Sequence, residues 1–303
     1  MNRLSDHLRS ALLALCLLAC GIARAIAAEA PSSGQDSAEG APPGAPTRIG
    51  DQTFRIFGLS APGYTWGQVR FPSSLQNEER HNLIVEGEVF QSIEKPLSDN
   101  LFIGPIADLY YMKDSKRFDY YNGIDIAVGG QIRWQPLDWI SISLGGREEW
   151  DFKPVSHRQD SEFIGLLTWY AFRRLPVDQP QNTMFSPKAY LLLAQGLVRY
   201  PSSHELKERN NTIIAGAFEG SADLSTKLPK LLVNTFVGIN YKADAERFDY
   251  NNWVTPGLGA KLKIAASDHV LFEIGAKIAA EYRWISERTR IGPVVFVNWS
   301  ADW

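Results

Sequence analysis

Two short segments combine aromatic rings and charges in the same order. They are Lys116-Arg117-Phe118-Asp119-Tyr120-Tyr121-Asn122 and, 130 residues later, Glu246-Arg247-Phe248-Asp249-Tyr250-Asn251-Asn252. An aromatic ring offers a flat face for stacking, and Arg and Asp side chains hydrogen-bond to hydroxyl groups. The repeat predicts two sites that stack on sugar rings, with the candidates Arg117, Phe118, Asp119, Tyr120, Arg247, Phe248, Asp249 and Tyr250. Two similar loops that bind nothing, arising by chance or by duplication of half the fold, are the alternative interpretation.

A second group of candidates consists of charged residues at alternate positions in otherwise apolar segments. Alternate residues of a β-strand share one face, so these charges would line the inside of a closed sheet. The candidates are Asp125, Arg133, Arg147, Glu149, Lys261, Lys263, Glu273, Lys277, Glu281 and Arg283. They predict either a narrow polar passage or a lumen plugged by ion pairs, and Glu273, Lys277 and Glu281 have a spacing that suggests pairing.

Residues that could break covalent bonds are sparse. His81, His157, His204 and His269 fall in expected connections or at strand ends, where we expect solvated side chains. Serine and aspartate neighbours of His157 in the sequence do not establish a catalytic triad. The spacing of His and carboxylate residues matches no metal site, and no glycine loop suits a phosphate. The sequence therefore predicts no enzyme, cofactor or metal, and a hydrolase at the barrel wall ranks as the third alternative.

The elements that carry these residues are strands with a period of two. From Val270 to Trp284 one face is almost wholly apolar and the other carries Glu273, Lys277, Glu281 and Arg283. Runs of this length, ending in Trp or Tyr, predict an all-β fold, a transmembrane antiparallel barrel of the outer-membrane type with about twelve strands. A soluble β-sandwich is the alternative. The expected strands are 53–71, 82–93, 101–111, 123–134, 139–151, 162–172, 188–200, 212–224, 231–241, 253–264, 269–284 and 291–303.

The connections support an even number of strands. Segments 135–138, 227–230 and 265–268 are short, as expected of periplasmic turns, whereas 112–122, 152–161, 201–211 and 242–252 are longer and polar, as expected of outer loops. The segment 173–187 is expected on the periplasmic side although it is long. Pro62-Gly63 leaves open whether the first strand contains a bulge or begins after a turn.

The amino terminus predicts export. Arg3 and Arg9 precede an apolar stretch and small residues, so residues 1–28 are expected to form a signal peptide. A lipobox ending at Cys20 is the alternative, which would make the protein a lipoprotein. Cys16 and Cys20 are the only cysteines, so ordinary cleavage leaves a chain without thiols. Residues 29–52, rich in Pro, Ala, Gly and Ser, are expected to form a disordered tail before a barrel at 53–303.

The charge balance and the last strand narrow the class further. The formal charge is -3, with 31 Lys and Arg against 34 Asp and Glu, which excludes a polycationic nucleic-acid binder. Trp303 ends the chain in phase with the apolar residues Val295, Val297, Trp299 and Ala301. This pattern resembles the recognition strand that the barrel-assembly machinery reads, and it predicts a Gram-negative outer membrane with its lipid as surroundings.

Segments 188–200, 210–220 and 250–259 carry a family resemblance. Their sequences, KAYLLLAQGLVRY, NNTIIAGAFEG and YNNWVTPGLG, resemble the carboxyl-terminal barrels of exopolysaccharide-export and phage N4 adsorption proteins over about residues 160–303. The resemblance implies a passive conduit for a secreted polysaccharide, or a surface receptor. Only a short tail precedes the barrel here, so contact with a synthase would need a separate periplasmic scaffold protein. A substrate-selective diffusion channel, a structural barrel or a phage receptor is the alternative.

Overall fold

The computed structural model describes residues 59–177, 184–204, 209–228 and 230–303. The predicted signal peptide at 1–28, both cysteines, the predicted tail at 29–52 and the first residues of the expected opening strand lie outside the described residues.

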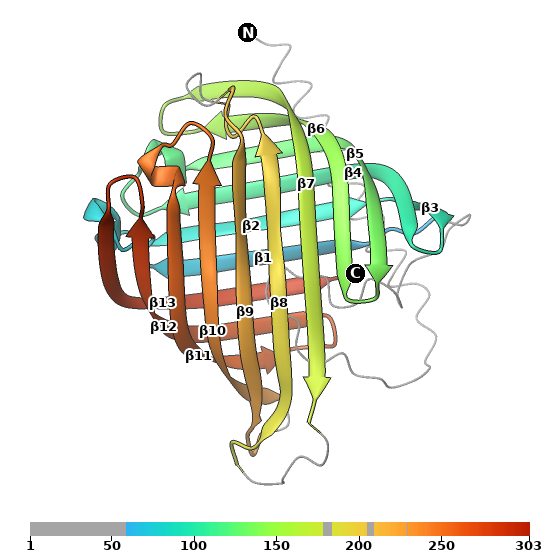
Figure 1. The fold of residues 1–303 in the computed structure, drawn as a ribbon, viewed down its shortest axis with the longest axis vertical. Helices are drawn as coiled ribbons and strands as arrows, with labels where there is room; N and C mark the ends of the chain where they lie inside the picture. The colour runs from blue at the N-terminus through green and yellow to red at the C-terminus, as the bar shows by residue number, and fades with distance from the viewer. Residues whose placement is uncertain (1–58, 178–183, 205–208, 229) are drawn as a thin grey trace. The chain divides into compact units, whose positions relative to one another are not determined.

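Twelve long antiparallel strands close into a barrel (Figure 1). Within the ring, each strand pairs with the strands that precede and follow it in the chain, and β2 pairs directly with β4. Pairing of the first strand, β1, with the last, β13, closes the ring. The short β3 (Lys95–Ser98) pairs only with β4, outside the ring. The strands are β1 (Gly63–Phe71), β2 (Ile84–Ser92), β4 (Leu101–Asp114), β5 (Gly123–Leu137), β6 (Ile140–Lys153), β7 (Arg158–Pro176), β8 (Pro187–Tyr200), β9 (Ile213–Ser225), β10 (Leu231–Asp244), β11 (Trp253–Ala265), β12 (Val270–Arg283) and β13 (Arg288–Asp302).

The expected fold class is confirmed, and each of the twelve expected segments overlaps one strand of the ring. The first strand begins at Gly63, so Pro62 precedes the strand and does not form a bulge within it. β7 continues to Pro176, beyond its expected end at residue 172, because it pairs with β8 along that extension.

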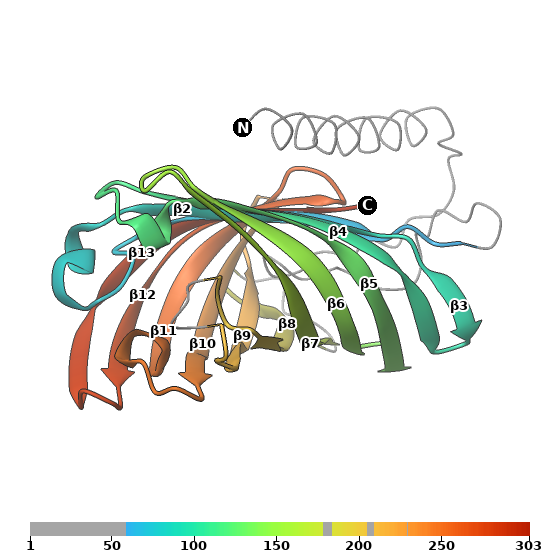
Figure 2. The ribbon, with the colours of Figure 1, turned by 90° about the horizontal axis from the view of Figure 1, so that it is seen from above.

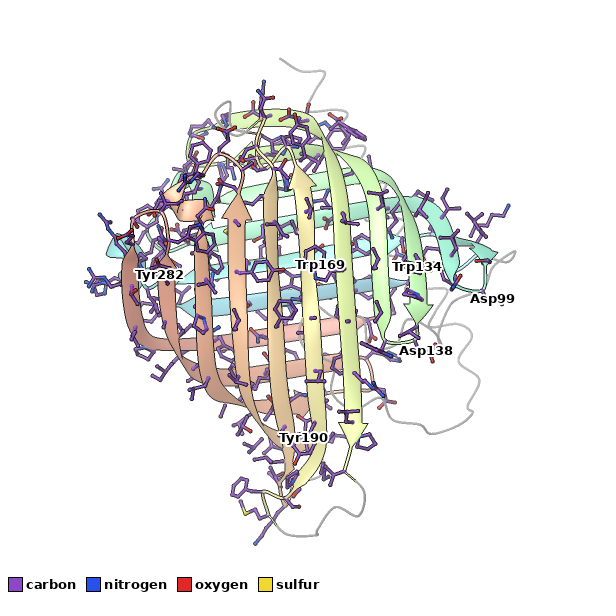
Figure 3. All side chains as sticks on the ribbon, in the orientation of Figure 1. Asp99, Trp134, Asp138, Trp169, Tyr190 and Tyr282 are labelled. Carbon is purple, nitrogen blue, oxygen red and sulfur yellow. The ribbon has the colours of Figure 1, made fainter. Side chains whose placement is uncertain are left out.

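The outer surface of the barrel is apolar in its middle. Leu144, Val237 and Leu258 are each more than 60% exposed although they sit at the centre of long strands. Aromatic side chains such as Trp134, Tyr190 and Tyr282 lie nearer the strand ends and are also exposed (Figure 3). An apolar band between aromatic residues is the surface that a barrel presents to a lipid bilayer. Among the described residues, no helix has both the length and the apolar composition needed to cross a membrane.

The two ends of the barrel differ. One end, called here the loop end, carries three short 3-10 helices, η1 (Asn77–His81), η2 (Asp119–Tyr121) and η3 (Asp249–Asn251). The other, called the turn end, carries β3 and the connections between β5 and β6, β7 and β8, β9 and β10, and β11 and β12. Contrary to expectation, segment 152–161 is no long outer loop, because β6 and β7 extend until only residues 154–157 connect them. Figure 2 shows the three helices on one side of the barrel and β3 on the opposite side.

The two halves of the barrel repeat one another. β1, β2 and β4–β7 form the first half, and β8–β13 form the second. Equivalent residues, offset by 129 or 130 positions, pair in the same register: Gly67 faces Gly87 as Gly196 faces Gly216. The pair Ile84–Asp114 in the first half corresponds to the pair Ile213–Asp244 in the second. The pair Phe71–Val295 corresponds in the same way to the pair Tyr200–Gly165. Register depends on pairing far apart in the sequence, so its repetition indicates a duplicated six-strand unit.

Candidate functional site: a basic cavity in the lumen

A cavity of about 870 Å³ extends from the loop end into the lumen. Its walls come from β1, from β8 to β13, from the loop-end residues Met112 of β4 and Lys153 of β6, and from the loops that carry η1, η2 and η3. Neutral polar side chains and aromatic rings dominate the wall between the charged groups. They include Gln68, Gln195, Asn240, Asn298, Tyr120, Tyr121, Tyr250 and Trp253. This size is within the range of pockets that bind small molecules, and its chemistry suits a polar ligand with many hydroxyl groups.

The charged side chains of this cavity are mostly positive. Six cations line it against three carboxylates, although the whole chain has a formal charge of -3. The cations are Arg70, Lys153, Lys242, Lys261, Lys277 and Arg283, and the carboxylates are Glu79, Glu219 and Glu281. A cavity with low-dielectric walls and charges of mostly one sign concentrates ligands of the opposite sign.

On the opposite side of the lumen, around β6, the charges neutralise one another. Glu149 is fully buried and accepts hydrogen bonds from Arg147 at 2.7 Å and from Arg199 at 2.7 Å. Arg147 also binds Asp108, and His204 Nε2 lies 3.0 Å from Glu149. His204 is only 4% exposed, so the expectation of a solvated loop side chain is wrong. The reason is that a buried carboxylate needs partners, and the loop after β8 supplies one by turning His204 inward.

Two further predicted lumen residues also meet charged neighbours. Arg133 donates hydrogen bonds from Nε and Nη2 to Glu94, which is 1% exposed, and the Arg133 guanidinium lies 4.2 Å from the centre of the Phe102 ring. Asp125 on β5 faces Asp151 on β6. Asp151 also lies 3.4 Å from Lys153, which lines the cavity.

At the turn-end side of the cavity, ion pairs also fill the lumen, and Lys261 and Glu219 belong to the cavity wall itself. Lys261 lies 3.3 Å from Glu219 and 3.2 Å from Glu273. Lys263 lies 3.2 Å from Asp223, which is fully buried. The passage is therefore narrow at this level.

Glu273, Lys277 and Glu281 do not pair with one another. Glu273 pairs with Lys261, and Glu281 pairs with Arg283 at 2.9 Å. Residues four apart on one strand are separated by about 13 Å, because a strand rises about 3.3 Å per residue. Glu273 therefore takes its partner from the neighbouring strand β11, and Glu281 takes the residue two positions along its own strand. Within the described part of the chain, Lys277 forms no hydrogen bond and no ion pair.

The repeated aromatic loops are held by one aspartate each. Asp244 accepts hydrogen bonds from the Phe248 backbone N–H and from the side chains of Asn211, Asn251 and Asn252. In the other copy, Asp114 accepts hydrogen bonds from the equivalent Phe118 N–H and from the side chains of Asn82 and Asn122. Arg117 and Arg247, at the same place in each loop, have φ values of 61° and 60°. The two copies are therefore equivalent in structure as well as in sequence.

The predicted stacking residues stack on one another. The ring centres of Phe118 and Tyr120 are 5.3 Å apart, and those of Phe248 and Tyr250 are 5.5 Å apart. Tyr120 and Tyr250 also line the cavity, so the fold brings the two copies to one site. In each pair the phenylalanine covers one face of the tyrosine ring and leaves the other face free of this contact.

The two repeated aspartates hold neighbouring loops. Asp119 accepts a hydrogen bond from Ser156 N at 3.1 Å, and Asp249 accepts one from Ser286 N at 2.9 Å. Each bond ties an aromatic loop to the hairpin beside it, between β6 and β7 or between β12 and β13.

Glu79 adds a contact that sequence reasoning missed. The hydroxyls of Tyr120 and Tyr121 donate to its two carboxylate oxygens at 3.1 and 3.0 Å. Burial, and next the Glu79 charge, raise the pKa of both phenols above the usual value, so both remain protonated donors.

Arg70 is another residue of the cavity that sequence reasoning missed, as are Lys153 and Lys242. A signal for Arg70 exists in the sequence, because Arg70-Phe71-Pro72-Ser73-Ser74 repeats as Arg199-Tyr200-Pro201-Ser202-Ser203. Comparison of these two segments identifies Arg70 as the residue equivalent to Arg199 in the duplicated unit.

No family model matches the chain, and no curated protein matches it. Among solved structures, the chain is similar to the β domain of the Bordetella autotransporter Brka, with 13% identity and a TM-score of 0.39 over 81% of this chain and 100% of that one. An outer-membrane channel from Pseudomonas putida F1 matches with 8% identity and a TM-score of 0.39 over 84% and 98%. LpxR from Salmonella typhimurium matches with 7% identity and a TM-score of 0.38 over 78% and 99%. The likeness is one of barrel architecture.

Proposed function

We propose that this protein is a narrow channel of the Gram-negative outer membrane that admits saccharides and performs no bond chemistry. The observation that carries the proposal is the lumen cavity, whose wall alternates tyrosine rings with amide side chains such as Gln68, Asn240 and Asn298. Aromatic rings and amides together suit the apolar faces and the hydroxyl edges of sugar rings. The ion pairs at the turn-end side of the cavity narrow the passage, so the width of a solute decides whether it passes.

The proposal includes the orientation and the partners of the barrel. The apolar band faces outer-membrane lipid, the loop end faces the cell exterior, and residues 1–28 direct export as a signal peptide. β13 and the Trp303 that follows it carry the alternating pattern that the barrel-assembly machinery reads. In this orientation the cavity faces outward and the paired charges face the periplasm.

Export of an exopolysaccharide is the second candidate. The two stacked aromatic pairs favour it, because they place rings on opposite loops of the exit that a growing chain would pass. A periplasmic scaffold supplied by another protein would then be required. Secretion of polysaccharide by cells that lack this protein separates the two candidates: a loss of secretion favours export, and unchanged secretion with lost saccharide uptake favours the channel.

Planar-bilayer recording of the purified barrel tests the proposal. We expect a small current that neutral oligosaccharides reduce in proportion to their occupancy of the cavity. Current that no oligosaccharide changes would indicate a general channel, and an absence of current would indicate a structural barrel. Either result would overturn saccharide selectivity.

A further inference from the structure

The duplicated halves of the barrel differ most where the cavity lies. Around β6, cations and carboxylates neutralise one another, whereas the equivalent residues around β12 keep the cations and lose the carboxylates. The equivalent positions are Arg147 and Lys277, Arg199 and Arg70, Asp108 and Gly238, Glu149 and Ala279, and His204 and Leu75.

On the β6 side, one carboxylate connects two cations. Glu149 lies 2.7 Å from Arg147 through Oε2 and 2.7 Å from Arg199 through Oε1. The two arginines stand on β6 and β8, with β7 between them. Charge-assisted hydrogen bonds of this kind are among the strong ones in proteins.

On the β12 side, both cations remain, but Ala279 stands at the position of the bridging carboxylate. Lys277 on β12 and Arg70 on β1 are separated by β13 in the same way. Within the described residues, Lys277 has no ion pair, and Arg70 has only Glu86 at 3.7 Å, with a buried Nε that has no hydrogen-bond partner. Arginine has five N–H donors, so this guanidinium is poorly satisfied.

The space that a carboxylate would need belongs to the cavity. Lys277, Arg70, Gly238 and Ala279 all line it. Gly238 has no side chain, and Ala279 belongs to one buried apolar cluster with Val294 and Leu75, the residue that takes the place of His204. The cavity thus opens where Asp108 and Glu149 stand on the opposite side.

We propose that this cavity binds the carboxylate of an acidic sugar, and that Lys277 and Arg70 hold it as Arg147 and Arg199 hold Glu149. The inference rests on the saccharide channel proposed above and names its substrate class, the uronic-acid saccharides. The amide and aromatic wall accounts for the sugar, and the two cations account for the acid.

A matched pair of ligands tests the subsite. A uronic-acid oligosaccharide and its carboxyl-reduced, neutral form differ only in the charged group, and each is applied to the barrel in a planar bilayer. We expect the acid to block the current at a concentration at least about tenfold lower, since hydrogen bonds to charged groups are stronger than those between neutral groups. Inorganic phosphate serves as a third ligand.

Substitutions then identify the residues. Lys277→Met should weaken the block by the acid about tenfold or more and leave the block by the neutral form unchanged, whereas Lys277→Arg should retain both. The double variant Leu75→His with Ala279→Glu rebuilds the β6-side arrangement, so its own carboxylate should displace the acidic ligand. Each variant is first shown to be folded by its resistance to protease in the outer membrane.

The outcomes separate this inference from the proposed function. If neither oligosaccharide blocks the wild-type current, the saccharide channel itself fails. If both block equally and Lys277→Met changes neither, the channel stands and the acidic subsite is overturned. If phosphate blocks as strongly as the uronic-acid ligand, the site is a general anion site, and the assignment to acidic sugars is overturned.

Discussion

Glu149 and Glu148 are adjacent residues with opposite surroundings. Glu149 is buried in the lumen among Arg147, Arg199 and His204, whereas Glu148 points to the lipid-facing side, opposite Val128 and Phe163. Removing one partner from a buried ion network leaves uncompensated charge, and this usually costs more than the network contributes. A carboxylate that faces lipid contributes no such network.

Glu149→Gln should therefore lower the free energy of unfolding by about 3–5 kcal/mol, because two buried guanidinium groups lose their counter-charge. Urea unfolding of the barrel in lipid vesicles measures the change. Glu148→Gln is the matched control, and we expect it to be neutral or stabilising. Equal unfolding midpoints for the two variants would contradict the account of the lumen network.

Asp244→Ala should loosen the second aromatic loop without preventing assembly. The substitution removes an acceptor that serves four donors, and each buried donor left unsatisfied costs about 1–3 kcal/mol. Limited proteolysis should then cut within 245–252, while Asp268→Ala, at an exposed turn, should leave the cleavage pattern unchanged. A loop as resistant as that of the wild type would show that the aspartate is dispensable.

Single residues were predictable only where the strand period fixes their face. The pattern places Lys261 and Lys263 on the polar face, but it does not identify Glu219 or Asp223 as their partners, since pairing depends on the register of neighbouring strands. Lys277 shows the same limit, because its expected partners on its own strand lie too far away. Arg70 was missed because its significance comes from the duplicated half.

At the scale of elements, the strands follow directly from sequence. Long alternating runs bounded by turn residues fix their number, and tertiary pairing fixes their ends. β7 shows the difference, since it runs to Pro176 along the length of β8. The short β3 escaped detection because Lys95–Ser98 has four exposed residues and no apolar face.

The two faces of a strand should respond differently to the same charge. Leu258→Lys, in the middle of the lipid-facing band, should destabilise the barrel by about 2–4 kcal/mol, because lipid cannot solvate an ammonium group. Asn240→Lys places the same group on the cavity wall and should be tolerated. The amount of each folded variant in the outer membrane is the measurement. Equal accumulation of both variants would contradict the assignment of faces.

At the scale of the molecule, the duplication explains an even strand count and places both aromatic loops at one end. The sequence repeat showed two loops, but their meeting at one cavity depends on closure of the sheet, which no local pattern encodes. The loss of carboxylates on the β12 side is visible only when the two halves are aligned strand by strand. We infer that divergence between the halves produced the cavity.

The proposed orientation predicts which positions are reachable from outside intact cells. Tyr120→Cys and Tyr250→Cys, at the loop end, should react with a membrane-impermeant maleimide. Asp138→Cys, at the turn end between β5 and β6, should react only after the outer membrane is opened. The reverse labelling pattern would invert the barrel and place the cavity on the periplasmic side.

The central claim is that saccharides pass through this barrel by way of its cavity, and flux of a labelled disaccharide into proteoliposomes tests it most directly. Asn240→Trp fills the cavity wall, and Ile239→Trp adds the same ring on the lipid-facing side. We predict flux through the wild type and Ile239→Trp, and little flux through Asn240→Trp. Equal flux through all three, or none through the wild type, would contradict the claim.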